Sequence, residues 1–312
     1  MGGKNIKIAI LGAGAIGSLF GALLWESGED IVLIGRKKHV EAIRSRGLKI
    51  SGISGERIVK PKAVTTTQEV GKVDLIIISV KSYDTEQAAK DALNMVHPDT
   101  VVLTIQNGLG NIEKLSEIIG EKHVIGGVTM QGSTFTKPGE IYHAGKGPTI
   151  IGELNGEITD RVKRIAETFN KAKIETKITR NIRGVLWDKI IINTGINALT
   201  AITRMKNGEL LKIPEIKNTM IEAVKEAVNV AKALNIKLEV KDHVKRVIEI
   251  AEATANNKSS MLQDVERGKR TEIDFINGAI VKLGKKLGIE TPVNETLTAL
   301  VKGIEWKLST TT

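Results

Sequence analysis

Apolar residues in the first half of the chain occur in short runs that are typical of strands buried on both faces. Four such runs are separated by helical or turn-rich segments: 6–11, 31–34, 73–80 and 101–105. Buried strands that alternate with helices indicate a parallel sheet with helices on both faces. Further apolar pieces are expected to extend this sheet, at 124–126, 141–143, 149–152 and 174–176.

The pattern changes near residue 180, where strand-like runs give way to helical periodicity. This periodicity predicts helices at 186–199, 214–234, 241–255 and 273–287. Pro214 suits the first turn of a helix, and Gly288 followed by Pro292 indicates that one helix ends and another begins. We therefore predict an α/β domain over residues 1–180 and an all-helical domain over residues 181–312.

The first apolar run leads into a glycine-rich turn, Gly12-x-Gly14-x-x-Gly17, which precedes a helical segment. Gly12 allows a tight exit from the strand, Gly14 leaves room for a pyrophosphate, and Gly17 lets the helix pack closely on the sheet. A bare glycine motif can be a simple turn, but the strand before it and the helix after it favour a doubly wound, Rossmann-type domain. Phosphate groups bind the N–H groups at such a helix start. The expected cofactor contacts are Gly12, Gly14, Ala15, Ile16 and Gly17.

The composition excludes several classes of function. The 312 residues contain no cysteine, which excludes disulfides, thiolate nucleophiles and cysteine-bound metals. The five histidines lack metal-type spacing, and we expect no metal site. No apolar run reaches the roughly 20 residues that span a bilayer, and the first run lacks a signal-peptide cleavage pattern. We therefore expect a cytoplasmic protein that does not bind membranes.

The net charge of +10 could attract either nucleic acid or small anions. Basic residues are interleaved with acidic ones, and only 3% of the residues are aromatic, so few side chains could stack on bases. We therefore expect a small anionic ligand and no nucleic-acid partner.

The segment 187–197 predicts a helix with an unusual polar stripe. Lys189, Asn193 and Asn197 are spaced by four and lie on one helix face, while isoleucines cover much of the remainder. A lysine on an apolar helix is often a surface group whose ammonium reaches solvent. The two amides in register with it favour a polar wall that faces a cleft.

A second polar cluster lies between residues 259 and 278. Ser260 and Gln263 have the spacing of a capping box, and a serine at a helix start can also bind a carboxylate. Glu272 precedes Ile273, which begins an apolar helical stripe, so this carboxylate lies near a buried edge. A solvated helix face is nevertheless the default interpretation of Glu272.

Two further polar residues follow predicted strands of the sheet. Lys81 ends the run 73–80, and Asn107 follows the run 101–105. Ligands of doubly wound sheets bind beyond the carboxyl ends of the strands, although either residue could be an ordinary loop residue.

Together these motifs resemble the ketopantoate reductase (2-dehydropantoate 2-reductase) family over nearly the whole chain. The resemblance is carried by the glycine turn, Lys81, Gln106-Asn107-Gly108, the Lys189 stripe, Asn207-Gly208-Glu209-Leu210, Ser259-Ser260-Met261-x-Gln263-Asp264 and Thr271-Glu272-Ile273-Asp274. The resemblance implies NAD(P)H-dependent reduction of the small molecule 2-dehydropantoate to (R)-pantoate, in pantothenate and coenzyme A biosynthesis.

The resemblance also implies a role for each matching residue. Lys189 would be the general acid that protonates the alkoxide formed at C2, and Glu272 would be its carboxylate partner and contact the cofactor. Asn193 and Asn197 would hold the substrate hydroxyl, and Ser260 its carboxylate. A paired carboxylate would raise the pKa of Lys189, whereas desolvation would lower it, and the sequence leaves both open.

Three more residues complete the implied site. Asn207 matches a further family asparagine and is expected to bind substrate. Lys81 and Asn107 would lie on the cofactor side of the cleft, and Asn107 would also contact substrate.

The second strand ends in Gly35-Arg36-Lys37-Lys38, which bears on the choice of cofactor. An acidic residue that binds the ribose hydroxyls of NAD is normally found here, and Arg36 stands in its place. Its guanidinium can bind a 2′-phosphate, so we expect NADP(H) to be preferred, with NAD(H) possible. A solvated basic turn is the alternative.

Two other functions and one assembly state are also compatible with the sequence. The chain could be a related dehydrogenase of another 2-hydroxy acid, or a non-catalytic dinucleotide sensor, which would not need the polar stripe. The apolar content of the helices between Met220 and Ala255 suggests a homodimer.

Overall fold

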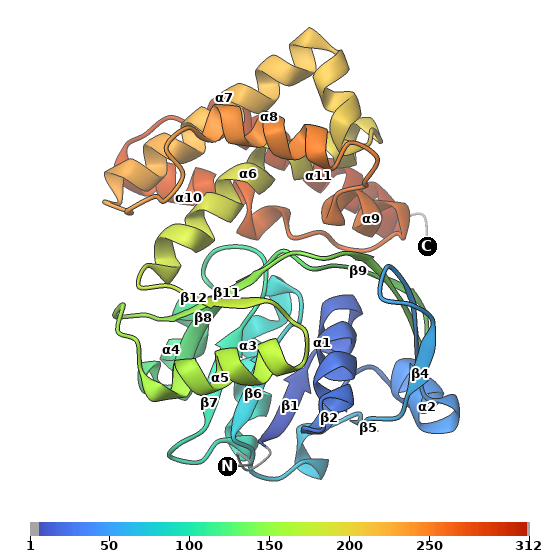
Figure 1. Cartoon of the computed structure of the whole chain (residues 1–312). Coiled ribbons are helices and arrows are strands. Elements are labelled where there is room, and N and C mark those ends of the chain that lie inside the picture. Colours follow the sequence, from blue (N-terminus) through green and yellow to red (C-terminus); the bar gives the residue numbers. More distant parts are fainter. Residues whose placement is uncertain (1–5, 311–312) are drawn as a thin grey trace. The chain divides into compact units, whose positions relative to one another are not determined.

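The computed structural model describes residues 6–310, and Figure 1 shows the course of the chain. Contacts between residues divide it into two compact units. The α/β unit comprises the chain up to Gln106 and residues 110–182, and the helical unit comprises Asn107–Leu109 and the chain from Arg183 onward. Each unit has its own hydrophobic core. Among residues 6–310, no helix is both long enough and apolar enough to cross a membrane.

Within the described residues, the α/β unit contains an eight-stranded sheet in the order β12-β11-β8-β7-β6-β1-β2-β5. Neighbouring strands are parallel except β8 and β11. The strands from β5 to β8, renumbered along the chain, have the Rossmann order 3-2-1-4-5-6. This confirms the predicted Rossmann-type sheet. The strands are β1 (Lys7–Leu11), β2 (Asp30–Ile34), β5 (Lys62–Val64), β6 (Leu75–Ile78), β7 (Val101–Thr104), β8 (Val124–Thr129), β11 (Thr149–Glu153) and β12 (Thr176–Ile178).

The α/β unit also contains a second sheet, in the order β4-β3-β10-β9. We expected residues 141–143 to extend the main sheet, and this prediction is wrong because they belong to β10. Ile141 and His143 are buried, whereas Tyr142 between them is exposed. β10 is buried on one face only, and the second sheet contacts α1. An interior strand of the main sheet is instead buried on both faces. These strands are β3 (Leu48–Gly52), β4 (Arg57–Val59), β9 (Gly132–Lys137) and β10 (Glu140–Gly145).

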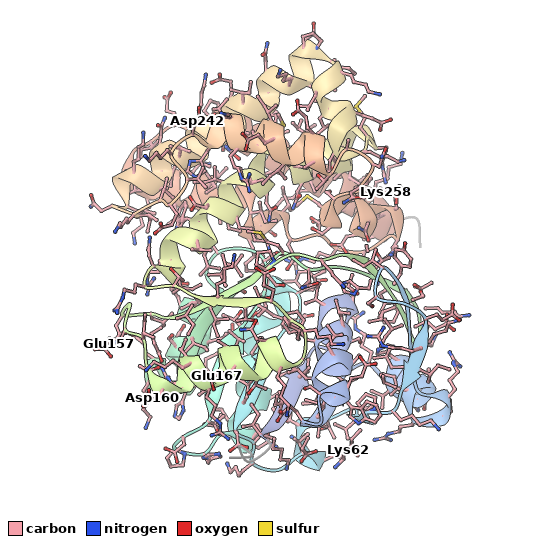
Figure 2. The ribbon with its side chains drawn as sticks, viewed as in Figure 1. Lys62, Glu157, Asp160, Glu167, Asp242 and Lys258 are labelled. Carbon is pink, nitrogen blue, oxygen red and sulfur yellow. The ribbon has the colours of Figure 1, made fainter. Side chains whose placement is uncertain are left out.

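The helices of the α/β unit are amphipathic. In α5, Val162 and Phe169 are buried, whereas Asp160 and Glu167 are exposed (Figure 2). Phe169 meets Phe20 of α1 edge to face, with 5.7 Å between ring centroids, so these two helices pack together. The helical elements here are α1 (Ala15–Glu26), α2 (Lys37–Arg46), η1 (Thr67–Glu69), η2 (Ser82–Asp84), α3 (Thr85–Ala92), η3 (Leu93–Met95), α4 (Asn111–Ile119), η4 (Glu121–His123) and α5 (Asp160–Lys171).

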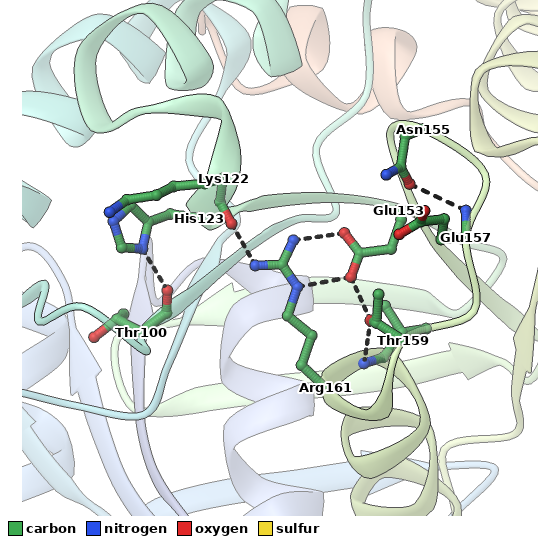
Figure 3. Close-up of polar contacts among 9 residues, drawn as sticks. Thr100, Lys122, His123, Glu153, Asn155, Glu157, Thr159 and Arg161 are labelled. Atoms are coloured by element: carbon green, nitrogen blue, oxygen red, sulfur yellow. Dashed lines mark hydrogen bonds and ion pairs between the residues drawn. The ribbon is translucent and has the colours of Figure 1, made fainter.

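A polar cluster joins the end of β11 to the start of α5 (Figure 3). Arg161 donates hydrogen bonds of 2.6 and 2.5 Å to the two carboxylate oxygens of Glu153, and Thr159 donates another of 2.5 Å. Burial alone would raise the pKa of Glu153, but the hydrogen bonds from Arg161 and Thr159 outweigh burial and hold this pKa below its usual value. Thr159 also caps α5 by accepting a hydrogen bond from its first turn. The ionised carboxylate therefore fixes the start of α5.

Helices are the regular elements found among the described residues of the helical unit, as predicted. The expected helices at 186–199, 214–234 and 241–255 are present as α6, α7 and α8. The segment 273–287 is not one helix, because Ile276 has φ −112° and ψ −95° and separates η6 from α10. The elements are α6 (Ile182–Thr203), η5 (Asn207–Lys212), α7 (Pro214–Ala233), α8 (His243–Ala253), α9 (Ser260–Glu266), η6 (Ile273–Phe275), α10 (Asn277–Leu287) and α11 (Pro292–Thr310).

The apolar residues that suggested a homodimer lie in the core of the helical unit. Met220, Val224, Val230 and Val247 are buried there, and none of the described large apolar side chains between residues 220 and 255 is exposed. The unit's own core therefore accounts for their number. The homodimer stays a prediction.

Candidate functional site

The glycine turn connects β1 to α1, and its glycines have different surroundings. Gly12 has φ +106°, and a Cβ atom there would lie 2.5 Å from the backbone nitrogen of Val80, so the turn requires glycine. A Cβ atom at Gly17 would collide with the carbonyl oxygen of Gly12 and lie 2.5 Å from Oγ of Ser79. At exposed Gly14, by contrast, the nearest atom would be 3.9 Å away. The backbone is therefore accessible at Gly14.

The start of α1 has the properties of a phosphate site. Gly14 is the N-cap residue, and no side chain caps the helix or places an acidic group in its first turn. Ala15 and Ile16 are half-buried beside it. Uncapped N–H groups at a helix start bind anions, so these residues fit the pyrophosphate of a dinucleotide.

A buried histidine that the sequence analysis did not single out supports this turn. His39 of α2 accepts a hydrogen bond of 2.9 Å at Nδ1 from the N–H of Gly139, so Nε2 carries the proton that is donated to Oγ of Ser18 at 3.0 Å. Burial lowers the pKa of His39 from 6.5 to about 4. The neutral ring therefore joins α1, α2 and the β9–β10 turn.

We expect this histidine to make the protein less stable in mild acid. The pKa of His39 is lower in the folded than in the unfolded state, so below pH 6.5 the unfolded state binds the proton first. Stability is then lost as the pH falls from 6.5 toward 4, by about 2 kcal/mol at pH 5 relative to pH 7. Urea denaturation of wild type and His39→Asn at both pH values measures this. An equal loss in both proteins would show that His39 is not the group responsible.

Arg36 lies just beyond the carboxyl end of β2 and is the N-cap residue of α2. It is exposed, and its guanidinium forms no hydrogen bond or ion pair with any described residue. Lys37 and Lys38 are also exposed, and Lys37 lies 3.9 Å from Glu41. This end of the strand therefore presents an accessible guanidinium to an anionic ligand.

Lys81 follows β6 and is half-buried at the start of η2. Nearby, the buried amide of Gln106 donates hydrogen bonds to the carbonyl oxygen of Val80 at 3.0 Å and to Oγ1 of Thr85 at 2.8 Å. Gln106 thus joins the ends of β6 and β7, and the backbone before Lys81 is held at the carboxyl end of the sheet.

Lys189, Asn193 and Asn197 follow one face of α6, as their spacing predicts. Asn197 is 5% exposed and Asn193 is half-buried, yet neither side-chain amide makes a hydrogen bond with any described residue. Buried amides are normally paired. Two unpaired amides in register with a lysine therefore form a surface suited to a polar ligand.

Burial lowers the pKa of Lys189 from 10.5 to about 8, although the charge of Glu272 acts in the opposite direction. Desolvation is therefore the larger of the two effects that the sequence left open. At neutral pH the ammonium is mostly protonated and is a better proton donor than an ordinary lysine.

Glu272 is 5% exposed and lies in the irregular segment before η6, so the expectation of a solvated helix face is wrong. The carbonyl oxygen of Phe275, the last residue of η6, accepts a hydrogen bond of 2.9 Å from the N–H of Leu109. Half-buried Asn107 therefore belongs to the helical unit, although it follows a strand of the α/β unit.

Ser259, not Ser260, caps α9. The Ser259 hydroxyl accepts a hydrogen bond of 3.1 Å from the first turn and lies 2.6 Å from Oγ1 of Thr200 in α6. The amide of Gln263 donates instead to the carbonyl oxygen of Lys258, so the capping box predicted for Ser260 is wrong. Ser260 is exposed at the first helical position, and its hydroxyl makes no hydrogen bond with any described residue. It is accessible to a ligand.

Asn207 begins η5 and is buried. Its Nδ2 donates a hydrogen bond of 2.9 Å to Oγ1 of Thr254, and its backbone N–H donates one of 3.0 Å to the carbonyl oxygen of Asn257. Its Oδ1 is buried and accepts no hydrogen bond from the described residues. Asn207 therefore joins η5 to the residues that follow α8.

Asp188, the residue next to Lys189, was not predicted to have a role. The carboxylate of Asp188 accepts hydrogen bonds from Nε2 of His243 at 2.8 Å and from the N–H groups of Glu239 and Val240 at 3.1 and 3.3 Å. These contacts fasten α6 to the start of α8. In the sequence, this role could have been inferred from Asp188 being a second charged residue on an otherwise apolar helix.

Two family models match the chain. The model described as ketopantoate reductase PanE/ApbA matches residues 8–156, and the model described as the C terminal of the same reductase matches residues 181–305. The 2-dehydropantoate 2-reductase of Pyrococcus horikoshii is 45% identical over 300 residues, which cover 96% of this chain and 98% of that protein.

Two solved structures are similar over almost their whole length. A PanE/ApbA family ketopantoate reductase from Ralstonia eutropha JMP134 has a TM-score of 0.91 at 36% identity, covering 97% of this chain and 99% of its own. A ternary structure of D-mandelate dehydrogenase with NADH and anilino(oxo)acetate has a TM-score of 0.91 at 31% identity, with the same coverage.

Proposed function

Because the chain belongs to the ketopantoate reductase family, we propose that it reduces 2-dehydropantoate to (R)-pantoate with NADPH as the preferred hydride donor. The observation that supports this most directly is Lys189, a half-buried lysine with a pKa of about 8 on the same helix face as two unpaired amides. A 2-oxo acid that also carries a hydroxyl group offers groups for all three side chains.

In this proposal the polar side chains of the helical unit bind the substrate and protonate it. Lys189 donates a proton to the C2 oxygen as negative charge develops there, and the buried carboxylate of Glu272 keeps the ammonium charged and oriented. Asn193 and Asn197 donate hydrogen bonds to the substrate hydroxyl. Ser260 binds the substrate carboxylate, and Asn107 and Asn207 complete the contacts with substrate.

The α/β unit would hold the cofactor. When bound, a nicotinamide dinucleotide supplies the hydride that is transferred to C2. The start of α1 fits its pyrophosphate, because Gly14 leaves the backbone accessible and the helix is uncapped. Lys81 is proposed to bind the cofactor beside the glycine turn. Asn107 and Glu272 are proposed to contact cofactor as well as substrate.

The test is nicotinamide absorbance in the presence of different 2-oxo acids. We expect the highest kcat/KM with ketopantoate. The analogue 2-oxoisovalerate lacks the hydroxymethyl group, so it would leave the amides of Asn193 and Asn197 unpaired and be reduced much more slowly. Equal or faster reduction of 2-oxoisovalerate or pyruvate would contradict the substrate assignment.

A second candidate is reduction of another 2-oxo acid, which the likeness to D-mandelate dehydrogenase favours. The 2-oxo acid that corresponds to mandelate therefore belongs in the same assay. A higher kcat/KM for this aromatic substrate would support the second candidate. Cofactor binding without turnover of any 2-oxo acid would support the non-catalytic sensor.

We expect Arg36→Ala to weaken the binding of NADPH much more than the binding of NADH. The guanidinium has no partner among the described residues, and its loss removes charged hydrogen bonds to a 2′-phosphate. The KM for NADPH should rise about 10- to 100-fold, while the KM for NADH stays nearly unchanged. Steady-state kinetics with both cofactors measure this.

Lys38→Ala is the control, because Lys38 is also exposed two residues away. A smaller effect of Lys38→Ala on NADPH would assign the specificity to Arg36 and not to general basic charge. A wild-type kcat/KM that is equal or higher with NADH would contradict the preference for NADPH.

A further inference from the structure

A fully buried asparagine connects the segments that carry the proposed catalytic residues. Asn277 is the first residue of α10 and is 0% exposed. Its Nδ2 donates hydrogen bonds to the carbonyl oxygen of Thr194 in α6 at 3.0 Å and to Oδ1 of Asn294 in α11 at 2.9 Å. Its Oδ1 is buried and accepts no hydrogen bond from the described residues.

Both ends of the Asn277 contact lie close to the proposed catalytic pair in sequence. Thr194 follows Asn193 on α6, within the turns that also carry Lys189. Asn277 directly follows residues 272–276, called the Glu272 segment here, and its hydrogen bond to Thr194 therefore connects the end of that segment to α6. The bond spans 83 residues of chain.

Asn277 also contacts a second buried asparagine, Asn294. Asn294 donates hydrogen bonds from Nδ2 to the carbonyl oxygen of Ala223 at 3.0 Å and to Oε2 of Glu226 at 2.7 Å. Glu226 also accepts hydrogen bonds from the N–H groups of Val293 and Asn294. The chain of polar contacts therefore runs from α7 through α11 to α10 and ends on α6.

Stability alone does not explain these polar side chains in an apolar core. Ile273, Ile276 and Ile280 around Asn277 are fully or almost fully buried. The unpaired Oδ1 of Asn277 costs stability, because a buried polar atom without a partner destabilises the fold, although Nδ2 of Asn277 provides the donor for Oδ1 of Asn294. The donor of Asn277 is thus more readily explained by the geometry that it imposes on α6.

We propose that Asn277 is a positioning residue that holds α6 and the Glu272 segment in register, so that Glu272 acts on the ammonium of Lys189. This inference rests on the proposed roles of Lys189 and Glu272. Without the donor, Thr194 keeps its place in the helix, but α6 loses its hydrogen bond to the residue that follows the Glu272 segment. The charge of Glu272 then raises the pKa of Lys189 less.

The experiment compares Asn277→Ala with Asn294→Ala. Asn294→Ala truncates the same polar chain at its far end and leaves the bond from Asn277 to Thr194 in place. The pKa of the Lys189 ammonium, followed by NMR titration of the intact protein, should fall below its wild-type value in Asn277→Ala and stay unchanged in Asn294→Ala. With ketopantoate, kcat should fall about 10- to 100-fold in Asn277→Ala only.

The outcomes separate this proposal from the proposed function. An unchanged Lys189 pKa in Asn277→Ala, or an equal shift in both variants, would overturn the positioning role. Asn277→Leu fills the space, although it leaves Oδ1 of Asn294 without its donor, and it provides the same readout if the alanine variant does not fold. A wild-type protein that does not reduce ketopantoate would contradict the proposed function instead. The NMR titration would still test whether the hydrogen bond from Asn277 to Thr194 affects the pKa of Lys189.

Discussion

Replacement of Lys189 by alanine is expected to lower kcat by ~10²- to 10⁴-fold while the KM for NADPH stays close to that of wild type. The reason is that the ammonium acts on charge that develops only as the C2 oxygen becomes an alkoxide. The glycine turn and Arg36 lie on other elements and are unaffected by the change. Steady-state and single-turnover kinetics measure both effects.

The pH dependence of wild type provides a second measurement of the same role. A general acid must carry its proton, so kcat should decline as the pH rises through about 8, the pKa of Lys189. This alkaline limb should disappear in Lys189→Ala, and a small primary amine added to the assay should restore part of the rate. An unchanged kcat in Lys189→Ala would make Lys189 an ordinary half-buried lysine.

Replacement of Glu272 by glutamine is expected to lower kcat about 10- to 100-fold and to raise the KM for ketopantoate. The charge of Glu272 raises the pKa of Lys189, so its removal should shift the alkaline limb to a pH below about 8. The measurement is the pH profile of kcat in the variant and in wild type.

Asp274→Asn is the matched control for Glu272→Gln. Asp274 lies two residues away and forms ion pairs with Lys302 at 2.6 Å and Arg270 at 3.5 Å, so its charge has other partners. In Asp274→Asn, the alkaline limb of the kcat profile should lie at the same pH as in wild type. A limb that moves to higher pH in Glu272→Gln, or moves equally in both variants, would contradict the assigned pairing.

The elements that could be predicted are those whose pattern is contained in a short stretch of chain. The buried strands and the glycine turn were recognisable because their periodicity and spacing lie within about a dozen residues. Residues 141–143 were assigned to the wrong sheet because β10 pairs with β3, where Ile141 lies opposite Ile50. Nothing local distinguishes a strand of the second sheet from one at the edge of the first.

The candidate site shows the same division. The helical spacing of Lys189, Asn193 and Asn197 placed them on one face, because the period of a helix follows from the backbone alone. Ser260 was taken for the cap because Ser259 and Ser260 are equivalent by sequence. In the folded protein Ser259 is the cap, and its hydroxyl also contacts Thr200, which lies 59 residues away in sequence.

The sequence by itself determined the change from alternating strands and helices to helices alone, the glycine turn and the polar stripe of α6, since these depend on neighbours along the chain. Only the tertiary structure decided that Glu272 is buried, that the pKa of Lys189 lies near 8, and that Asn277 reaches Thr194. Desolvation and long-range hydrogen bonds depend on atoms that folding brings together from distant parts of the chain. The chemistry proposed for Lys189 therefore depends on the packing around it as much as on its identity.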